Sequence, residues 1–125
     1  MKNILIADDD DTIRRALSYA LTQFGHKAYK AGDGAEALEI LKANPEIEIV
    51  ILDLKMPVMT GHEIWPLIKG MRPDIEIIIS SGFVDESAVS ELINNGIKYI
   101  LRKPYPLTVL QDIISSHSSR QDTHR

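Results

Sequence analysis

The sequence predicts an α/β domain built on an open, doubly wound parallel sheet. Short apolar runs alternate with segments of helical periodicity, which is the pattern of consecutive β/α units. Three of these runs are nearly continuous in Ile, Leu and Val, as is typical of strands that helices cover on both faces. The five predicted strands are residues 4–7, 27–31, 47–52, 75–79 and 99–101.

The first two predicted helices have clear ends. Apolar residues from Ile13 to Phe24 form one helical stripe, and Gly25 follows at a position where a left-handed residue commonly ends a helix. Residues 35–43 form the second helix, which we expect to stop before Pro45.

The three later helices are marked mainly by their starts. Thr60 and Glu63 have the spacing of a capping box, in which each side chain binds a free backbone N–H of the other's residue. Pro66 removes a backbone donor inside this third helix and predicts a late start or a kink. Asp85 is positioned to cap the fourth helix, and an apolar stripe from Leu107 marks the fifth.

Length and composition fit one globular domain. The chain has 125 residues, of which 44% are hydrophobic and 26% charged, and we expect the domain over residues 1–117 and a frayed polar tail over 118–125. A net charge of −4 without a basic run argues against nucleic-acid binding. The absence of cysteine excludes thiol chemistry. The start resembles neither a signal peptide nor a membrane span, so we expect a cytoplasmic protein without a membrane partner.

Polar residues follow four of the five predicted strands. The carboxyl ends of parallel strands meet at one edge of the sheet, where open α/β folds bind ligands, so these residues should converge. Singly, each has a plainer explanation as a helix cap, a turn residue or a solvated charge. Their coincidence at one edge favours a functional site. They are Asp8, Asp9 and Asp10 after the first strand, Asp53 after the third, Ser80 and Ser81 after the fourth, and Lys103 after the fifth.

Carboxylates in such a cluster need a compensating positive charge. Two unit charges about 4 Å apart repel by about 4 kcal/mol at an effective dielectric of about 20. Either some carboxyl groups are protonated or a cation lies among them, and a site of oxygen ligands suits Mg²⁺. The four histidines lack ligand spacing, and we interpret all of them as surface residues. An aspartate beside Mg²⁺ and a lysine can act as a nucleophile toward a phosphoryl group.

From Asn3 to about Ile114 the sequence closely resembles the receiver domains of bacterial response regulators. ILIADDD is similar to their first strand and acidic pair, and AGDGAEALEIL to their second turn and helix. DLKMPVMTG is similar to the phospho-acceptor strand and loop, and ILRKPY to the end of the fifth strand. The resemblance implies a flavodoxin-like (βα)5 fold with five parallel strands in the order 2-1-3-4-5. SSGF together with RKPY also resembles receivers attached to hybrid sensor kinases.

The resemblance implies a role for each acidic residue of the cluster. Asp53 would be the phospho-acceptor. Asp8, Asp9 and Asp53 would hold Mg²⁺, and the backbone carbonyl of Lys55 would complete the protein ligands. Asp10 would be an accessory acid near the metal.

The resemblance also implies which residues bind the phosphoryl group. Ser81, rather than Ser80, occupies the family's hydroxyl position, and Lys103 is its phosphate-binding lysine. The bond between Lys103 and Pro104 is often cis in such domains, because proline lowers the free-energy cost of a cis peptide bond.

Ile100 departs from the family, which often has Tyr or Phe at this position. An isoleucine has no ring to turn inward, so we expect the switch to act through the loop after Ser81 and the fourth helix. Neither Tyr99 nor Tyr105 is expected to substitute. Tyr99 should point to the opposite face from Ile100, and Tyr105 is held behind a proline.

The function that these features favour is a phosphorylation-controlled binding module in a two-component phosphorelay. Its phosphoryl group would come from a sensor histidine kinase or a histidine phosphotransfer protein, and its output would be an unidentified protein or a phosphorylation-dependent homodimer. It would be a switch and not a metabolic enzyme, with at most self-catalysed phosphorylation and dephosphorylation. The alternative is a metal-dependent phosphohydrolase with an aspartate nucleophile, which should need a substrate pocket that the short loops do not offer. A nucleotide or flavin carrier is weaker, because no glycine-rich phosphate loop follows the first strand.

Overall fold

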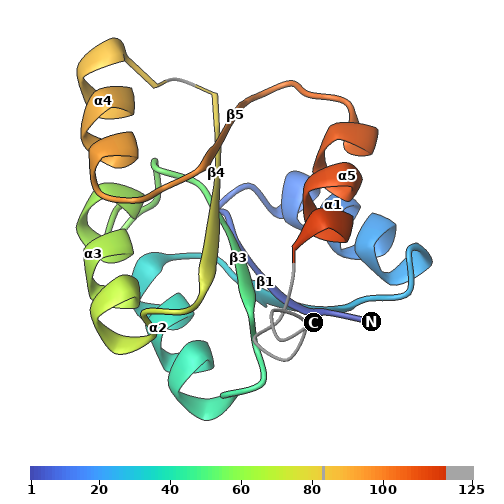
Figure 1. The fold of residues 1–125 in the computed structure, drawn as a ribbon. Helices are drawn as coiled ribbons and strands as arrows, with labels where there is room; N and C mark the ends of the chain where they lie inside the picture. The colour runs from blue at the N-terminus through green and yellow to red at the C-terminus, as the bar shows by residue number, and fades with distance from the viewer. Residues whose placement is uncertain (83, 118–125) are drawn as a thin grey trace, which may run out of the picture.

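Five parallel strands form one sheet between two layers of helices in the computed structural model, which describes residues 1–82 and 84–117 (Figure 1). The strand order is β2-β1-β3-β4-β5, and all four neighbouring pairs are parallel. This confirms the predicted fold class and strand order. The tail predicted over 118–125 lies outside the described residues. The strands are β1 Asn3–Ala7, β2 Lys27–Ala31, β3 Ile49–Leu52, β4 Glu76–Ser81 and β5 Tyr99–Arg102.

One helix follows each strand. Helices α1 and α5 cover one face of the sheet, and α2, α3 and α4 cover the other (Figure 1). In the described part of the chain, no helix has the length and apolar character needed to cross a membrane. The helices are α1 Asp11–Gln23, α2 Gly34–Ala43, α3 Gly61–Met71, α4 Glu86–Asn94 and α5 Leu107–Ser116.

The helix ends follow the predicted signals, with one exception. Gly25 ends α1 with φ +90°, and Thr60 and Glu63 form both bonds of the capping box at the start of α3. Because α3 begins directly after Thr60, the late start predicted from Pro66 is wrong. Pro66 has no N–H to donate to the carbonyl of His62, one helical turn earlier. Both residues lie on the exposed face of α3, so water can replace this donor.

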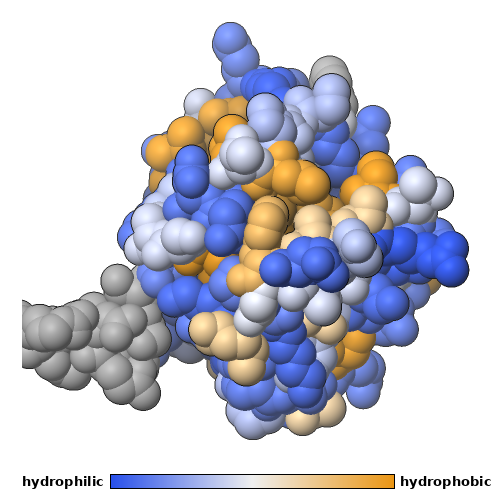
Figure 2. Space-filling model, turned by 90° about the vertical axis from the view of Figure 1, so that its right-hand side faces the viewer, coloured by the Kyte–Doolittle hydropathy of each residue, from blue (hydrophilic) through white to orange (hydrophobic). Residues whose placement is uncertain are grey.

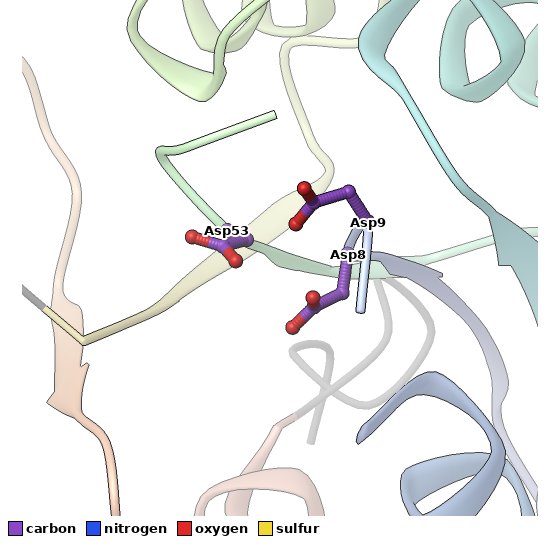
Figure 3. Close-up of side chains that lie close together, drawn as sticks. All are labelled: Asp8, Asp9 and Asp53. Carbon is purple, nitrogen blue, oxygen red and sulfur yellow. The ribbon is translucent and has the colours of Figure 1, made fainter. Parts of the chain in front are cut away.

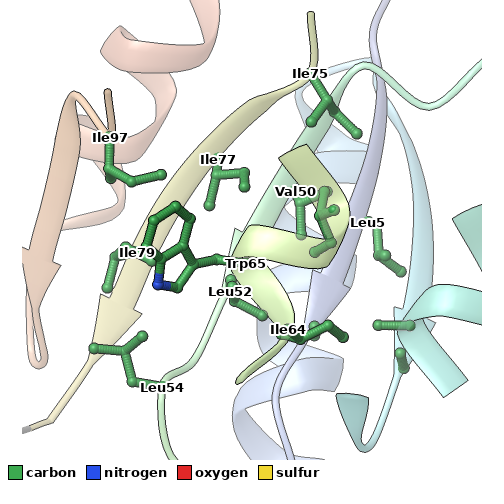
Figure 4. Packing of buried hydrophobic residues seen from close by; sticks show 14 of the residues in the cluster. Leu5, Val50, Leu52, Leu54, Ile64, Trp65, Ile75, Ile77, Ile79 and Ile97 are labelled. Carbon is green, nitrogen blue, oxygen red and sulfur yellow. The ribbon is translucent and has the colours of Figure 1, made fainter. Parts of the chain in front are cut away.

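Alternate residues of the strands build the two halves of the core. Leu5, Leu52 and Ile79 belong to the cluster beneath α2, α3 and α4, where Ile64 and Trp65 of α3 face them (Figure 4). Ile6, Ile51 and Ile78 belong to the cluster beneath α1 and α5. The same alternation places Ile100 against the first cluster and Tyr99 against the second, which confirms that these two side chains point to opposite faces.

Two histidines at the amino-terminal edge of the sheet are more enclosed than the sequence predicted. The side chain of His117 is only 11% exposed and lies 3.6 Å from a carboxylate oxygen of Glu48 and 3.8 Å from one of Glu76. His26 Nδ1 accepts a hydrogen bond from the backbone N–H of Lys2 at 3.1 Å. The surface interpretation is therefore wrong for His117 and incomplete for His26. His124 lies outside the described residues.

The environment of His26 predicts a loss of stability in acid. Burial lowers the pKa of His26 below its ordinary value of 6.5, and the charges of the N-terminus and Lys2 lower it further, against opposing effects of Gln111 and Glu48. The folded state thus favours neutral His26, whose Nδ1 must be unprotonated to accept from Lys2. This contribution is complete above the unfolded pKa and is lost as the pH falls through the lowered folded pKa.

Urea unfolding of wild type and His26→Asn at several pH values between about 7.5 and 5 measures this contribution. The Asn side chain offers an acceptor near the position of Nδ1 but does not titrate, so the two proteins differ in the titration of residue 26 alone. We expect the stability of wild type to fall relative to the variant as the pH decreases. A constant difference would mean that His26 does not sense pH.

Candidate functional site

Three carboxylates from two neighbouring strands meet at the carboxyl edge of the sheet. Asp8 and Asp9 follow β1, Asp53 follows β3, and their side chains point toward a common space (Figure 3). One carboxylate oxygen from each residue lies within 4.8 Å of the others. Asp8 is 2% and Asp53 6% exposed, whereas Asp9 is open to solvent. Two of the three carboxylates are therefore held in a site with restricted access to water.

Lys103 supplies a positive charge to the two buried carboxylates. Its Nζ lies 2.6 Å from Asp8 Oδ2 and 3.2 Å from Asp53 Oδ2. Burial alone would lower the pKa of Lys103, but the hydrogen bond to Asp8 and the charges of Asp53 and Asp8 outweigh it and raise that pKa above 10.5. The ammonium group is therefore charged at neutral pH and reduces the repulsion between the carboxylates.

The backbone fixes the second oxygen of each buried carboxylate. The N–H of Lys55 donates to Asp53 Oδ1 at 3.0 Å, and the N–H of Asp10 donates to Asp8 Oδ1 at 2.9 Å. Each carboxylate thus has one oxygen held by a backbone N–H and the other by Lys103. Both side chains are held in one orientation before any ligand arrives.

Of the other residues predicted for the site, Ser81 lies at the end of β4, whereas the side chain of Asp10 lies at the start of α1. Ser81 ends β4 and is fully buried beside Ser80, and the bond between Lys103 and Pro104 is cis. Asp10 is not one of the three converging carboxylates. Its side chain caps α1 by accepting from the N–H groups of the second and third residues after it.

Two residues that the sequence did not predict as part of the site lie close to it. Arg14 of α1 donates from Nη1 to the backbone carbonyl of Asp8 at 2.7 Å and from Nη2 to Asp11 Oδ1 at 2.9 Å. Tyr105 has its phenolic oxygen 2.8 Å from the hydroxyl oxygen of Ser80. The spacing of Asp11 and Arg14 on a helix indicates the ion pair between these two residues. No local pattern signals the contact of Arg14 with the Asp8 carbonyl, or the contact of Tyr105 with Ser80, which joins residues 25 positions apart.

The start of α3 lies directly against the strand that carries Asp53. A Cβ atom on Gly61 would lie 2.4 Å from the carbonyl oxygen of Asp53 and 2.6 Å from Cα of Leu54. The N–H of Gly61 also donates to the carbonyl of Leu54 at 3.0 Å. Only glycine allows this approach, so Gly61 helps to determine the position of Asp53.

An open hollow of about 570 Å³ lies beside the acidic cluster, between the starts of α3 and α4. The sequence predicted no pocket of this kind from the short loops. Asp9 and Lys55 border it on the side of the cluster, and His62 and Asp85 border it on the side of the helices. The site therefore has space for a group larger than a metal ion.

Comparison of this chain with known proteins identifies relatives in sequence and in structure. A family model described as the response regulator receiver domain matches residues 4–115. A receiver domain protein from Clostridium thermocellum has a TM-score of 0.91 and 29% identity, with complete coverage of both chains. The CheX-CheY-BeF3-Mg complex from Borrelia burgdorferi contains a chain with a TM-score of 0.85 and 30% identity, covering 94% of this chain and 90% of that one.

Curated relatives include proteins much longer than this chain. The sensor kinase CckA of Brucella abortus is 30% identical over 120 residues, which is 95% of this chain and 13% of the kinase. The chain spans 49% of the response regulator RR06 of Streptococcus pneumoniae and 25% of FleR of Pseudomonas aeruginosa. The similarity therefore concerns one domain of these proteins.

Proposed function

Because the chain belongs to the response regulator receiver domain family, whose members act in phosphorelay signalling, we propose that Asp53 is its phospho-acceptor. The observation that carries this proposal is the way in which the Asp53 carboxylate is held. One oxygen is bound by the Lys55 N–H and the other by the Lys103 ammonium, with Asp8 and Asp9 beside them. A buried nucleophile with fixed orientation next to a cation is suited to phosphoryl transfer.

We propose Mg²⁺ as the cofactor, because the donor set is suited to a hard cation. The three converging carboxylates supply only oxygen ligands, and Lys55, whose carbonyl we assign as the further ligand, borders the same hollow as Asp9. The proposed protein ligands are therefore Asp8, Asp9, Asp53 and the carbonyl of Lys55. Bound Mg²⁺ would offset the negative charge on the oxygens of the transferring phosphoryl group.

The proposed reaction forms one bond and breaks one. A carboxylate oxygen of Asp53 attacks the phosphorus of a phosphohistidine, the P–N bond breaks, and the imidazole nitrogen keeps the electron pair and takes up a proton. The product is an acyl phosphate on Asp53. Lys103 and Ser81 would then bind the phosphoryl oxygens, Lys103 through its charge and Ser81 through its hydroxyl.

We assign the docking of the phosphodonor to the side of the molecule formed by α1 and α5. Apolar side chains gather around a hollow on this side (Figure 2). A groove of about 300 Å³ there is lined by Ile13 and Leu17 of α1 and by Tyr105 and Leu107, and it reaches Lys103. A donor must bring its phosphorus into contact with Asp53, which Lys103 touches, so an apolar groove that reaches Lys103 is suited to binding a histidine kinase or phosphotransfer protein.

The remaining functional predictions rest on family membership. We infer a signalling role without metabolic turnover, because the family consists of phospho-acceptors. The phosphohydrolase alternative finds no support among the relatives. The cytoplasmic location, the downstream partner and a phosphorylation-dependent homodimer stay predictions.

Intact mass spectrometry tests the proposed function. The protein is incubated with a small phosphodonor such as acetyl phosphate or phosphoramidate, with Mg²⁺ and with a chelator in parallel. We expect one phosphoryl adduct that forms only with Mg²⁺, is stable in acid and is lost in base. If none of the donors produces an adduct, the proposal is refuted.

Asp9→Asn should weaken Mg²⁺ binding by about tenfold or more, because it removes one of three converging carboxylates from a site where each charge attracts the ion. Asp10→Asn is the matched control. Its side chain caps α1, and Asn caps a helix as well as Asp does. Titration of both variants with Mg²⁺ measures the difference. Equal losses, or a larger loss in Asp10→Asn, would mean that the acidic pair has been assigned one residue out of register.

A further inference from the structure

We propose that Tyr105 is a positioning residue, which fixes the loop that carries Lys103 by sharing a hydrogen bond with the buried hydroxyl of Ser80. This inference rests on the proposed function of Asp53 and Lys103. It concerns the aromatic residue that follows Pro104 and not the position of Ile100.

Ser80 lies beside the phospho-acceptor in the sheet. The register pairs Leu52 of β3 with Ile79 of β4, so the next residues, Asp53 and Ser80, are neighbours across the two strands. Ser80 is 1% exposed and follows the alternation of Ile78, which faces α1 and α5. A hydroxyl buried in this position needs a partner, and Tyr105 provides it at 2.8 Å.

The loop after β5 is therefore attached to β4 at two consecutive residues. The backbone N–H of Lys103 donates to the carbonyl of Ser81 at 2.9 Å, and two residues later Tyr105 binds Ser80. The long side chain of Lys103 has many rotamers, so the position of its backbone decides which of its conformers can reach Asp53. The two attachments hold that backbone where Nζ contacts both Asp8 and Asp53.

Packing keeps the ring of Tyr105 in place. The ring contacts the core cluster beneath α1 and α5 and lines the apolar groove together with Ile13 and Leu17. Burial raises the pKa of Tyr105 above 10.0, so the phenol stays protonated and can donate at neutral pH. Tyr105 thus connects the groove to the strand next to Asp53.

The attachment has a consequence for the phosphorylated state. When Asp53 carries a phosphoryl group, Lys103 must exchange its contact with Asp53 Oδ2 for a phosphoryl oxygen. A loop that is already ordered loses little conformational freedom in this exchange, whereas a released loop must be ordered first. Losing the Ser80 hydrogen bond should therefore weaken the binding of a phosphoryl group but not the binding of Mg²⁺, whose proposed ligands lie on other loops.

Tyr105→Phe and Ser80→Ala test the inference with beryllofluoride as the phosphoryl analogue. Isothermal titration in Mg²⁺ measures the affinity of each variant for beryllofluoride, and a separate titration measures Mg²⁺ alone. We expect each single variant to bind beryllofluoride about fivefold more weakly, as befits one hydrogen bond, with unchanged affinity for Mg²⁺. The double variant should be no weaker than either single one, because both lose the same bond. Tyr99→Phe, which removes a phenol on the same face of the sheet, is the control and should bind like wild type.

The outcomes separate this inference from the proposed function. If wild type binds no beryllofluoride, the proposed function of Asp53 fails. If wild type binds it and Tyr105→Phe and Ser80→Ala bind it equally well, or if their losses multiply in the double variant, the positioning role of Tyr105 is refuted. A lower thermal stability with unchanged beryllofluoride affinity also refutes it, because the hydrogen bond would then serve the fold alone.

Discussion

Asp53→Asn is expected to abolish acyl phosphate formation while leaving the fold intact. An amide nitrogen or oxygen is a poor nucleophile, so no phosphoryl adduct should form with any small donor. The fold should survive, because the Asn side chain can still accept from the Lys55 N–H and Lys103 keeps its contact with Asp8. Intact mass after incubation with phosphodonor and Mg²⁺ measures the loss, and far-ultraviolet circular dichroism verifies the fold.

Asp112→Asn is the matched control for this experiment. It makes the same chemical change on an exposed position of α5, away from the carboxyl edge of the sheet, and should accept a phosphoryl group like wild type. An undiminished, base-labile adduct in Asp53→Asn would show that another residue is the acceptor. Peptide mapping of that adduct would then identify it.

Gly61→Ala should strongly destabilise the protein, whereas Gly70→Ala in the same helix should not. The added Cβ would lie 2.4 Å from the carbonyl oxygen of Asp53 and 2.6 Å from Cα of Leu54, both of them backbone atoms that no rotamer change can move. Either α3 or the end of β3 must shift, and overpacking of this kind costs about 1–3 kcal/mol or more. Since the displaced strand end carries the acceptor, phosphorylation should slow as well. Urea unfolding measures the free energy of unfolding.

Gly70→Ala provides the control within the same helix. No heavy atom lies within 4 Å of a Cβ built at Gly70, which is exposed near the end of α3. This substitution should stabilise the protein by about 0.5–1 kcal/mol, because Ala favours the helix over Gly. Similar changes in stability for the two variants would mean that the close approach at Gly61 is not maintained in solution.

Much of the fold and of the candidate site could be predicted from the sequence, because the relevant signals are local. The continuous apolar runs of β1 and β3 reflect burial on both faces, and the spacing of Thr60 and Glu63 reflects one helix turn. Asp8, Asp9 and Asp53 could be brought together in advance, because parallel strands end at a common edge. Their assigned roles rested on the resemblance to receiver domains.

Contacts between residues distant in the chain were decided only by the tertiary structure. The sequence could not indicate that Lys103 Nζ lies 2.6 Å from Asp8 Oδ2. Nor could it indicate that Tyr105 binds Ser80, or that His117 lies close to both Glu48 and Glu76. A local pattern reports which face of an element is buried, but the partner of a polar side chain depends on how the elements pack. The sequence alone therefore determined the fold, the edge of the sheet at which the polar residues meet, and the kind of chemistry that they suit. The tertiary structure decided which atoms hold the nucleophile in place.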